Sequence, residues 1–462
     1  MRHGSDIQSD LSLVMRQILA LISLLLFIEG NISAQSNISS PQIQIIPNKA
    51  LIDENVSIQL TGFQPGQHIV LRVKATDDLN KKWESYAEFQ ADENGRVNIG
   101  SQKPLSGTYN EADSTGLFWS MKLMSEEQTS LFAKSTLTPL EFSFSVEVEN
   151  TVVTSATLER LFISKEVIRI PVRENGLAGV LFLPDSSHIH PGVITIGGSE
   201  GGLNESTAAL LASRGYAAFA LAYFNYEHLP AGLVNIPLEY FKTAIHWMQK
   251  QRNINAKKIG FMGTSRGAEA TLLAASHFPE IKAVVVKVPS AVVWEGVWGE
   301  FAADITYPSW TYNGIPLPIM RSSTPAEKQK VLEKEPLVQV NRFLVRLSEK
   351  NEIKKAIIPV EKIKAPILLI SAQDDHLWPS TLMSEMIVKG LQEYHFPYKV
   401  QHLSYKGSGH RIWIPNLPTT VTVTMHPVRK KMTSLGGNAR DNAWAASDSW
   451  SHVLKFLGEN LR

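Results

Sequence analysis

A serine held between two glycines is the feature that most constrains this chain. The pentapeptide Gly-Thr-Ser-Arg-Gly at 263–267 follows an apolar run at 259–262 and precedes an alanine-rich run at 268–277. These runs predict a strand, a sharp turn and a helix. In that context a G-x-S-x-G motif holds its serine on a strained turn, where a side chain at either glycine would crowd the strand and the helix. We therefore predict that Ser265 is a nucleophile at the edge of a parallel sheet.

A serine hydroxyl becomes a good nucleophile only when a base takes its proton and a carboxylate orients that base. A buried strand is predicted at 366–370, and the acidic pair Asp374 and Asp375 follows it. The next predicted strand, 398–405, leads into a glycine-rich loop that carries His410. This chain order of serine, acid and histidine is the one found in α/β hydrolases. We therefore expect a serine hydrolase or acyltransferase on a mostly parallel, doubly wound sheet.

The acid and the base are each chosen from several candidates. Asp375 is favoured as the orienting acid because Trp378 and Pro379 follow it, which is the usual pattern of the acid loop. Asp374 is interpreted as a cap or brace of that loop. His410 is favoured as the base because a strand, glycines and the chain order coincide there. The histidines set aside are His376, His395 and His402.

The reaction also needs donors for the charge that develops on the carbonyl oxygen. One donor is expected to be the backbone N–H of Arg266, directly after the nucleophile. A predicted strand at 193–196 runs into a loop at 197–202 that has four glycines in six residues, and Gly198 and Ser199 are its candidate donors. A phosphate-binding loop is the competing interpretation, but the G-K-[ST] signature and the G-x-G-x-x-G spacing are missing from it.

Five segments together resemble the acyl-CoA thioesterase and bile acid-CoA:amino acid N-acyltransferase family. They are Gly263–Glu269, Leu221–Pro230, Ile358–Glu361, Gln373–His376 and Gly409–His410, and the likeness spans about Pro41 to a C-terminal helix at 441–461. The resemblance implies an immunoglobulin-like β-sandwich followed by an α/β-hydrolase domain. It also implies a Ser or Cys nucleophile with Asp and His, roles that fall on Ser265, Asp375 and His410.

Within the family that the chain resembles, the acyltransferase branch typically carries Cys as nucleophile and the thioesterase branch carries Ser. With Ser265 and no cysteine in the chain, hydrolysis of an acyl-CoA thioester to a free acid and CoA is the expected reaction. A carboxylesterase or peptidase, or an amino acid N-acyltransferase, on the same scaffold is the alternative, because fold and triad do not identify the acyl group. An exported binding protein with an inactive triad is the alternative from another class.

Composition excludes several other classes of protein. The net charge is +1, with 19% charged residues, which gives no sign of a nucleic-acid partner or a strongly charged membrane partner. The absence of cysteine excludes disulfides, thiolate chemistry and cysteine-based metal sites. No H-E-x-x-H or similar metal-binding spacing replaces them, so neither a metal nor another cofactor is expected. The expected partner is a small acyl thioester or ester, and the oligomeric state is left open.

The N-terminus is interpreted as a processing segment. Arg16 precedes an apolar run at 18–28, which is too short to span a membrane and is typical of a signal peptide. Residues 1–34 are therefore expected to be a signal peptide or an N-terminal extension, with Met15 as an alternative start. A cut after Ala34 would place Ile32 at the −3 position, which is an imperfect site. Export is expected, and a cytoplasmic location is the alternative because acyl-CoA is an intracellular metabolite.

The two folded parts differ in their hydrophobic pattern. Polar and apolar residues alternate through 42–45, 56–60, 68–73 and 141–148, which predicts half-buried antiparallel strands. A β-sandwich is therefore expected at 41–164. Buried strands alternate with helices farther along the chain, which predicts the α/β-hydrolase domain at 165–462.

Aromatic residues near the expected site have two interpretations. An insertion at about 290–355 carries Trp294, Trp298, Trp310 and Tyr312, and insertions at this point of the fold commonly cover the site. Tyr223 and Phe224 follow a predicted strand directly. We expect Tyr223, Phe224 and Trp294 to bind the acyl group, with packing in the core as the other interpretation.

Overall fold

The computed structural model describes residues 40–125, 129–298, 306–324, 326–327, 330 and 334–462. The expected signal peptide at 1–34 lies outside the described residues, and so do parts of the expected insertion at 290–355. Among the helices in the described ranges, none combines the length and the apolar character that a membrane span requires.

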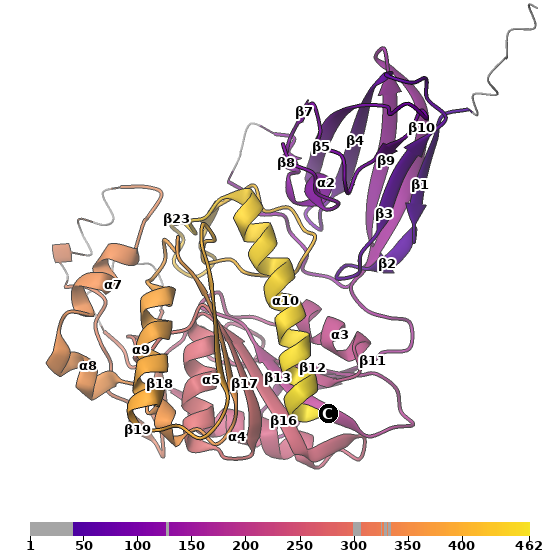
Figure 1. Cartoon of the computed structure of the whole chain (residues 1–462). Helices are drawn as coiled ribbons and strands as arrows, with labels where there is room; N and C mark the ends of the chain where they lie inside the picture. Colours follow the sequence, from indigo (N-terminus) through magenta and orange to yellow (C-terminus); the bar gives the residue numbers. More distant parts are fainter. Residues whose placement is uncertain (1–39, 126–128, 299–305, 325, 328–329, 331–333) are drawn as a thin grey trace, which may run out of the picture.

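The N-terminal part is built from two mainly antiparallel sheets (Figure 1). The two sheets share an apolar core. One has the order β1-β3-β6: β1 (Gln42–Ile46), β3 (Ser57–Thr61) and β6 (Val97–Asn98). The other has the order β2-β10-β9-β4-β5-β7, with β8 also paired to β5: β2 (Lys49–Leu51), β4 (His68–Thr76), β5 (Lys82–Gln90), β7 (Ser106–Gly107), β8 (Lys122–Leu123), β9 (Leu140–Val148) and β10 (Thr151–Leu161). β2 joins β10 in parallel, at the edge of its sheet.

Alternation along these strands produces the core between the two sheets. In β4 and β5 every second residue is buried, so one face of the sheet is apolar and the other is solvated. Ile58 and Leu60 of the smaller sheet belong to the same core as Phe142 and Phe144 of the larger one. The four strands expected from alternation correspond to β1, β3, β4 and β9. A short helix, α2 (Gly116–Trp119), buries its apolar residues beside this core.

The rest of the chain surrounds an eight-stranded sheet of order β11-β12-β14-β13-β16-β17-β20-β21. Its strands are β11 (Ile168–Val172), β12 (Ala178–Leu183), β13 (His190–Ile196), β14 (Ala217–Ala222), β16 (Ile254–Thr264), β17 (Ile281–Lys287), β20 (Ile367–Ala372) and β21 (Val400–Tyr405). All neighbouring pairs from β14 to β21 are parallel, whereas β11 and β12 run antiparallel to their neighbours. The α/β-hydrolase fold expected from the sequence is therefore present, on a mixed sheet.

Helices cover both faces of this sheet (Figure 1). α3 (Ser206–Ser213) and α10 (Ala439–Leu461) pack on one face, and α4 (Leu238–Gln249), α5 (Arg266–His277) and α9 (Ser380–Glu393) pack on the other. Adjacent residues on a strand therefore enter different cores, as Met262 and Phe261 do. This explains why the parallel strands have nearly continuous apolar sequences instead of alternating ones.

Several smaller elements lie outside the large sheet. They are β15 (Ile236–Pro237), β18 (Trp310–Tyr312), β19 (Ile315–Pro316), α7 (Val340–Arg346), α8 (Lys350–Ala356), η1 (Val360–Lys362), β22 (Val423–Met425) and β23 (Met432–Ser434). The segments that follow β13, β16, β20 and β21 carry the residues expected in the site. Because parallel strands end at the same edge of a sheet, these four segments meet.

Candidate active site

Ser265 lies on a strained turn between β16 and α5. Its backbone has φ 55° and ψ −120°, an unusual conformation for a residue with a side chain. Its N–H donates to the carbonyl of Lys287 at 2.9 Å, which ties the turn to the neighbouring strand. A Cβ at Gly263 would lie 2.2 Å from the carbonyl oxygen of Gly267, and a Cβ at Gly267 would lie 2.1 Å from that of Gly197. Both glycines are therefore required by close backbone packing.

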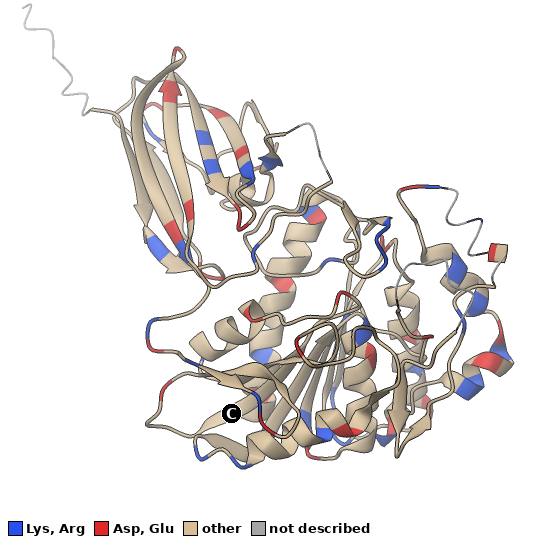
Figure 2. Cartoon of the chain, turned by 180° about the vertical axis from the view of Figure 1, so that it is seen from behind, with Lys and Arg blue, Asp and Glu red and all other residues tan. Residues whose placement is uncertain are grey.

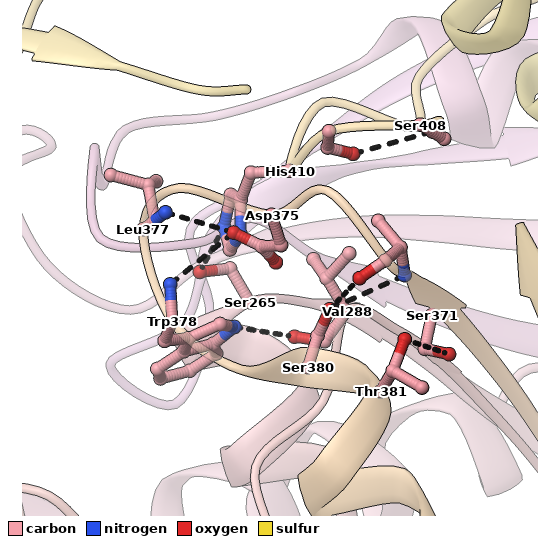
Figure 3. Close-up of polar contacts among 12 residues, drawn as sticks. Ser265, Val288, Ser371, Asp375, Leu377, Trp378, Ser380, Thr381, Ser408 and His410 are labelled. Carbon is pink, nitrogen blue, oxygen red and sulfur yellow. Dashed lines mark hydrogen bonds and ion pairs between the residues drawn. The ribbon is translucent and has the colours of Figure 1, made fainter. Parts of the chain in front are cut away.

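The structure brings Ser265, His410 and Asp375 together in a continuous hydrogen-bonded row (Figure 3). His410 Nδ1 lies 2.8 Å from Asp375 Oδ2, and His410 Nε2 lies 2.9 Å from Ser265 Oγ. With the Nδ1 proton directed at the carboxylate, Nε2 is free to accept the serine proton. All three side chains are buried, which limits competition from water.

The Asp375 carboxylate is held in place by its own loop. Its Oδ1 accepts the backbone N–H groups of Leu377 and Trp378 at 2.9 Å and 3.2 Å (Figure 3). The indole N–H of Trp378 in turn donates to the carbonyl of Val288 at 3.2 Å. These bonds fix the direction in which the Asp375 carboxylate faces His410.

The neighbouring acid and histidine point elsewhere. Asp374 is exposed, and its Oδ2 accepts the backbone N–H of Gly437 at 3.0 Å, which braces the loop. His376 Nδ1 lies 2.9 Å from the hydroxyl of Ser434. Neither side chain contacts Ser265 in the described structure. Of the two neighbouring acids, Asp375 is the one that contacts His410.

The expected oxyanion donors surround Ser265, and one of them is already engaged. The Arg266 N–H opens α5 and makes no hydrogen bond to the described part of the chain. Gly198 lies against the serine, since a Cβ placed on it would be 3.1 Å from Ser265 Cβ. However, the Gly198 N–H donates to Glu200 Oε1 at 2.9 Å. A carboxylate oxygen thus lies where sequence reasoning placed the substrate oxygen.

Ser199 contacts a second histidine that sequence reasoning did not identify. His426 follows β22, and its Nε2 lies 3.0 Å from Ser199 Oγ. Its Nδ1 accepts the N–H groups of Val428 and Arg429, so the neutral ring carries its proton on Nε2 and donates it to Ser199. Burial, with the nearby positive charge of Arg429, lowers the pKa of His426 to about 3. The alternating residues at 420–425 indicate a strand before this histidine, but that pattern does not distinguish it as a contact of Ser199.

A buried ion pair lies beneath the nucleophile turn. Arg266 Nη1 lies 3.2 Å from Glu269 Oε2, and Trp310 donates its indole N–H to Glu269 Oε1 at 2.7 Å. Arg266 Nη2 also donates to the carbonyl of Trp294 at 3.0 Å. Glu269 is fully buried, and burial raises its pKa to about 7 despite the nearby guanidinium. This network connects the start of α5 to the aromatic segment.

Two cavities meet at Ser265 and His410. The larger has a volume of about 380 Å³, and the strand residues Thr195, Met262, Thr264 and Lys287 contribute to its wall. The smaller has a volume of about 40 Å³ and is lined by Arg266, Trp294, Arg342 and Phe343, among others. A thioester bound at Ser265 can therefore extend in two directions.

The structure corrects part of the substrate-binding expectation. Tyr223 and Phe224 line neither cavity; both are buried under the loop at 197–202. The Tyr223 hydroxyl donates to the carbonyls of Gly197 and Gly198 at 3.0 Å and 3.1 Å, so this residue supports the loop from below. Trp294 does line the smaller cavity. Because strand ends lead both into the core and toward the crevice, the sequence pattern could not separate these two cases.

The other tryptophans of the expected insertion have different surroundings. Trp310 is buried and binds Glu269, whereas Trp298 is 52% exposed. Among the described ranges, no group of three or more His, Asp or Glu side chains is arranged to hold a metal ion.

The chain matches two protein-family models and is similar in sequence to several known proteins. Residues 236–462 match the family model described as BAAT / Acyl-CoA thioester hydrolase C terminal, and residues 53–174 match Acyl-CoA thioester hydrolase/BAAT N-terminal region. Mouse mitochondrial acyl-coenzyme A thioesterase 2 is 31% identical over 88% of this chain and 87% of the mouse protein. The chain belongs to the BAAT/acyl-CoA thioester hydrolase family.

The relatives include both thioesterases and an amino acid N-acyltransferase. Mouse bile acid-CoA:amino acid N-acyltransferase is 30% identical over 91% of this chain and 98% of the mouse protein. Mouse acyl-coenzyme A thioesterase 1 is 30% identical over 88% and 94%. The resemblance drawn from the five sequence segments is thereby confirmed, while the choice between hydrolysis and transfer to an amine depends on the site itself.

Proposed function

We propose that this member of the BAAT/acyl-CoA thioester hydrolase family is a serine hydrolase that cleaves acyl-CoA to a free carboxylic acid and CoA. The observation that carries the proposal is the row of 2.9 Å and 2.8 Å contacts from Ser265 through His410 to Asp375. The family's thioesterases support the choice of a thioester as the bond that is broken.

In the first half of the proposed reaction, Ser265 Oγ attacks the thioester carbonyl while His410 Nε2 takes its proton. Asp375 stabilises the imidazolium that forms. The carbon–sulfur bond then breaks, and His410 returns the proton to the departing CoA thiolate. In the second half, water loses a proton to His410 and attacks the acyl-serine ester, which releases the acid and restores the Ser265 hydroxyl.

The charge on the carbonyl oxygen is stabilised by backbone donors in this mechanism. The N–H of Arg266 is one donor, and its place at the start of α5 adds the positive end of the helix dipole. Gly198 is the second donor once the substrate oxygen replaces Glu200 Oε1 on its N–H. Ser199, held by His426, fixes the loop on which this donor lies.

Water is preferred over an amine as the acyl acceptor because the intermediate is an oxyester. An amidating enzyme must hold its acyl group until an amine arrives, and a thioester on cysteine suits this better than an ester on serine. The chain has no cysteine. We therefore propose hydrolysis over amino acid transfer and over ester or peptide cleavage on the same scaffold.

The first prediction tests both the nucleophile and the acceptor. Ser265→Ala should lower thioesterase turnover by about 10⁴-fold or more while leaving the fold intact. Release of free CoA thiol from acyl-CoA, with glycine supplied in excess, is followed together with analysis of the acyl product. Ser451→Ala, at an exposed position on α10, is the matched control. Residual activity within about tenfold of wild type would refute the role of Ser265, and N-acylglycine as the main product would replace hydrolysis by transfer.

We also propose the division of the chain into a domain at 41–164 with the immunoglobulin-like topology implied by the resemblance and a catalytic domain at 165–462. Two observations support it. The sheets formed by β1 to β10 share no strand with the sheet formed by β11 to β21. The two family models match separate segments of the chain.

A further inference from the structure

Lys287 is an unusual residue for the inner wall of a cavity beside a serine nucleophile. It ends β17 and is only 4% exposed, yet it lines the cavity of about 380 Å³ beside Ser265. Its ammonium donates to the carbonyls of Ile412 and Trp413 at a long 3.4 Å each. Among the described residues no carboxylate lies within ion-pair distance of this ammonium. A charge so deeply buried is normally compensated by an opposite charge.

Arg411 adds a second cation to the same cavity. It directly follows His410, and its guanidinium lies 4.4 Å from the centre of the Trp413 ring. Burial lowers its pKa to about 10, a shift that the charge of Glu200 opposes, so it stays protonated at neutral pH. In the parts of the chain that the structure covers, no carboxylate lies within ion-pair distance of Arg411, although the charge of Glu200 acts on it from farther away.

The sheet register places polar groups together on the wall that carries Lys287. Thr195 pairs with Met262, and Thr264 pairs with Lys287, on parallel neighbours. Met262 and Thr264 are two residues apart on one strand, so all four side chains share a face of the sheet. The hydroxyl of Thr195 is buried without a hydrogen-bond partner in the described structure. The ammonium, which contacts two carbonyls and lies 6.0 Å from the centre of the Trp450 ring, thus lines this wall without an anionic partner in the described structure. The Thr195 hydroxyl lines it without a hydrogen-bond partner there.

The charges of the cavity indicate what kind of group completes it. Two cations and the single carboxylate of Glu200 leave one net positive charge, which one carboxylate of the ligand would neutralise. A phosphate monoester, with a charge of about −1.5 to −2 at neutral pH, would overcompensate it. Met262 and Ile412 provide apolar surface for methylene groups in the same cavity.

We propose that this cavity selects acyl groups that carry a second carboxylate at the end remote from the thioester, and that Lys287 and Arg411 bind that carboxylate. The inference rests on the proposed thioesterase function and specifies its substrate class. An acyl chain that ends in a methyl group would leave the buried ammonium without an anionic partner, so it should be used less well.

The test compares two six-carbon substrates on the full-length protein. Wild type should have a kcat/KM for adipoyl-CoA at least about tenfold above that for hexanoyl-CoA, the difference that one charged hydrogen bond supports. Lys287→Met should remove that preference by lowering the adipoyl-CoA value about tenfold or more, while hexanoyl-CoA turnover is kept or raised. Retained hexanoyl-CoA turnover shows that the variant is folded. Lys389→Met, at an exposed position on α9, should change neither value.

Other outcomes overturn the proposal in distinguishable ways. If Lys287→Met leaves the ratio of the two kcat/KM values unchanged, the cations do not bind the acyl carboxylate. If the variant raises KM equally for both substrates, the cations bind the CoA phosphates instead. A matched pair of p-nitrophenyl esters, the glutarate monoester and the butyrate ester, measures the same preference without CoA. If this ester preference is present but neither acyl-CoA is cleaved, the thioesterase proposal fails and the pocket stands.

Discussion

Asp374 and Asp375 are neighbours in the chain but have different surroundings. Asp375 is 4% exposed and contacts His410 through both carboxylate oxygens, at 2.8 Å and 3.0 Å. Asp374 is exposed and receives the Gly437 N–H. At the residue scale, one peptide unit therefore separates a buried acid that contacts His410 from an exposed acid that contacts the loop at Gly437.

The second prediction uses this difference. Asp375→Asn keeps the size of the side chain but removes its charge, which leaves the imidazolium of His410 unstabilised and favours the wrong tautomer. We expect kcat to fall by about 10⁴-fold, a loss typical of this substitution in serine triads. Asp374→Asn should stay within about tenfold of wild type. Steady-state kinetics on acyl-CoA measure both variants, and the reverse order of the two losses would show that the acid has been misassigned.

Ser265, Asp375 and His410, which the structure brings together, could be selected from the sequence because each one follows a strand and their order in the chain is typical of α/β hydrolases. Glu200 and His426 were not predicted, and the reason is physical. The hydrogen bond from Gly198 N–H to Glu200 Oε1 depends on a local turn of the glycine-rich loop, where many conformations are accessible. His426 reaches Ser199 from a segment more than two hundred residues away, as the separation of 227 positions shows. Sequence pattern carries no information about such a contact.

At the scale of elements, the strand ends were easier to predict than the strand directions. Alternation and buried apolar runs identified the strands that bear the site. The antiparallel orientation of β11 and β12 was not predicted, since a strand buried on both faces has the same composition in either direction. The start of α5 is the element that most affects the site, because it carries both the Arg266 N–H and the ion pair of Arg266 with Glu269.

The third prediction concerns the stability of that helix. Burial raises the pKa of Glu269 from 4.5 to about 7, so between these pH values the folded protein binds more protons at this site than the unfolded chain does. The contribution of this group to the free energy of unfolding is therefore complete below pH 4.5 and declines as the pH rises toward 7. Integrated over the window, the decline is on the order of 3 kcal/mol.

Glu269→Gln removes this titrating group, so the free energy of unfolding should depend less on pH in this range. Urea unfolding of both proteins at several pH values measures the free energy of unfolding. Between pH 4.5 and 7, the value for the variant should rise relative to that of wild type by roughly 3 kcal/mol. Glu393→Gln, at an exposed position on α9, should run parallel to wild type. Parallel curves for Glu269→Gln as well would mean that Arg266 keeps the buried carboxylate ionised.

At the scale of the whole molecule, the N-terminal sheets and the large sheet are joined by polar contacts. Asp53 receives two bonds from the guanidinium of Arg214, at 2.6 Å and 3.0 Å, and one from the indole of Trp450 at 2.8 Å. Asn416 donates to the carbonyl of Ile52 at 2.7 Å. Leu131, from the N-terminal part, also lines the larger cavity, so the junction contributes to the wall of that cavity.

Charged residues of both signs are interspersed over the two parts of the chain (Figure 2). The contribution of an ion pair to the stability of the junction depends on how deeply its side chains are buried. The Asp53 side chain is 1% exposed, whereas Glu111, which pairs with Arg440 across the same junction, is 51% exposed. An exposed ion pair contributes about 0 to 1 kcal/mol, because water screens it and both side chains lose freedom.

The last prediction compares these two contacts between the parts. Asp53→Ala leaves a guanidinium and an indole N–H without their acceptor, and it should lower the free energy of unfolding by about 3 kcal/mol. Glu111→Ala should lower it by less than about 1 kcal/mol. Guanidinium unfolding, followed by tryptophan fluorescence, measures both, and Asp53→Ala should also broaden or split the transition as the parts unfold separately. Equal small losses in the two variants would show that Asp53 does not hold the junction, and the two parts would then be joined mainly by apolar packing along α10.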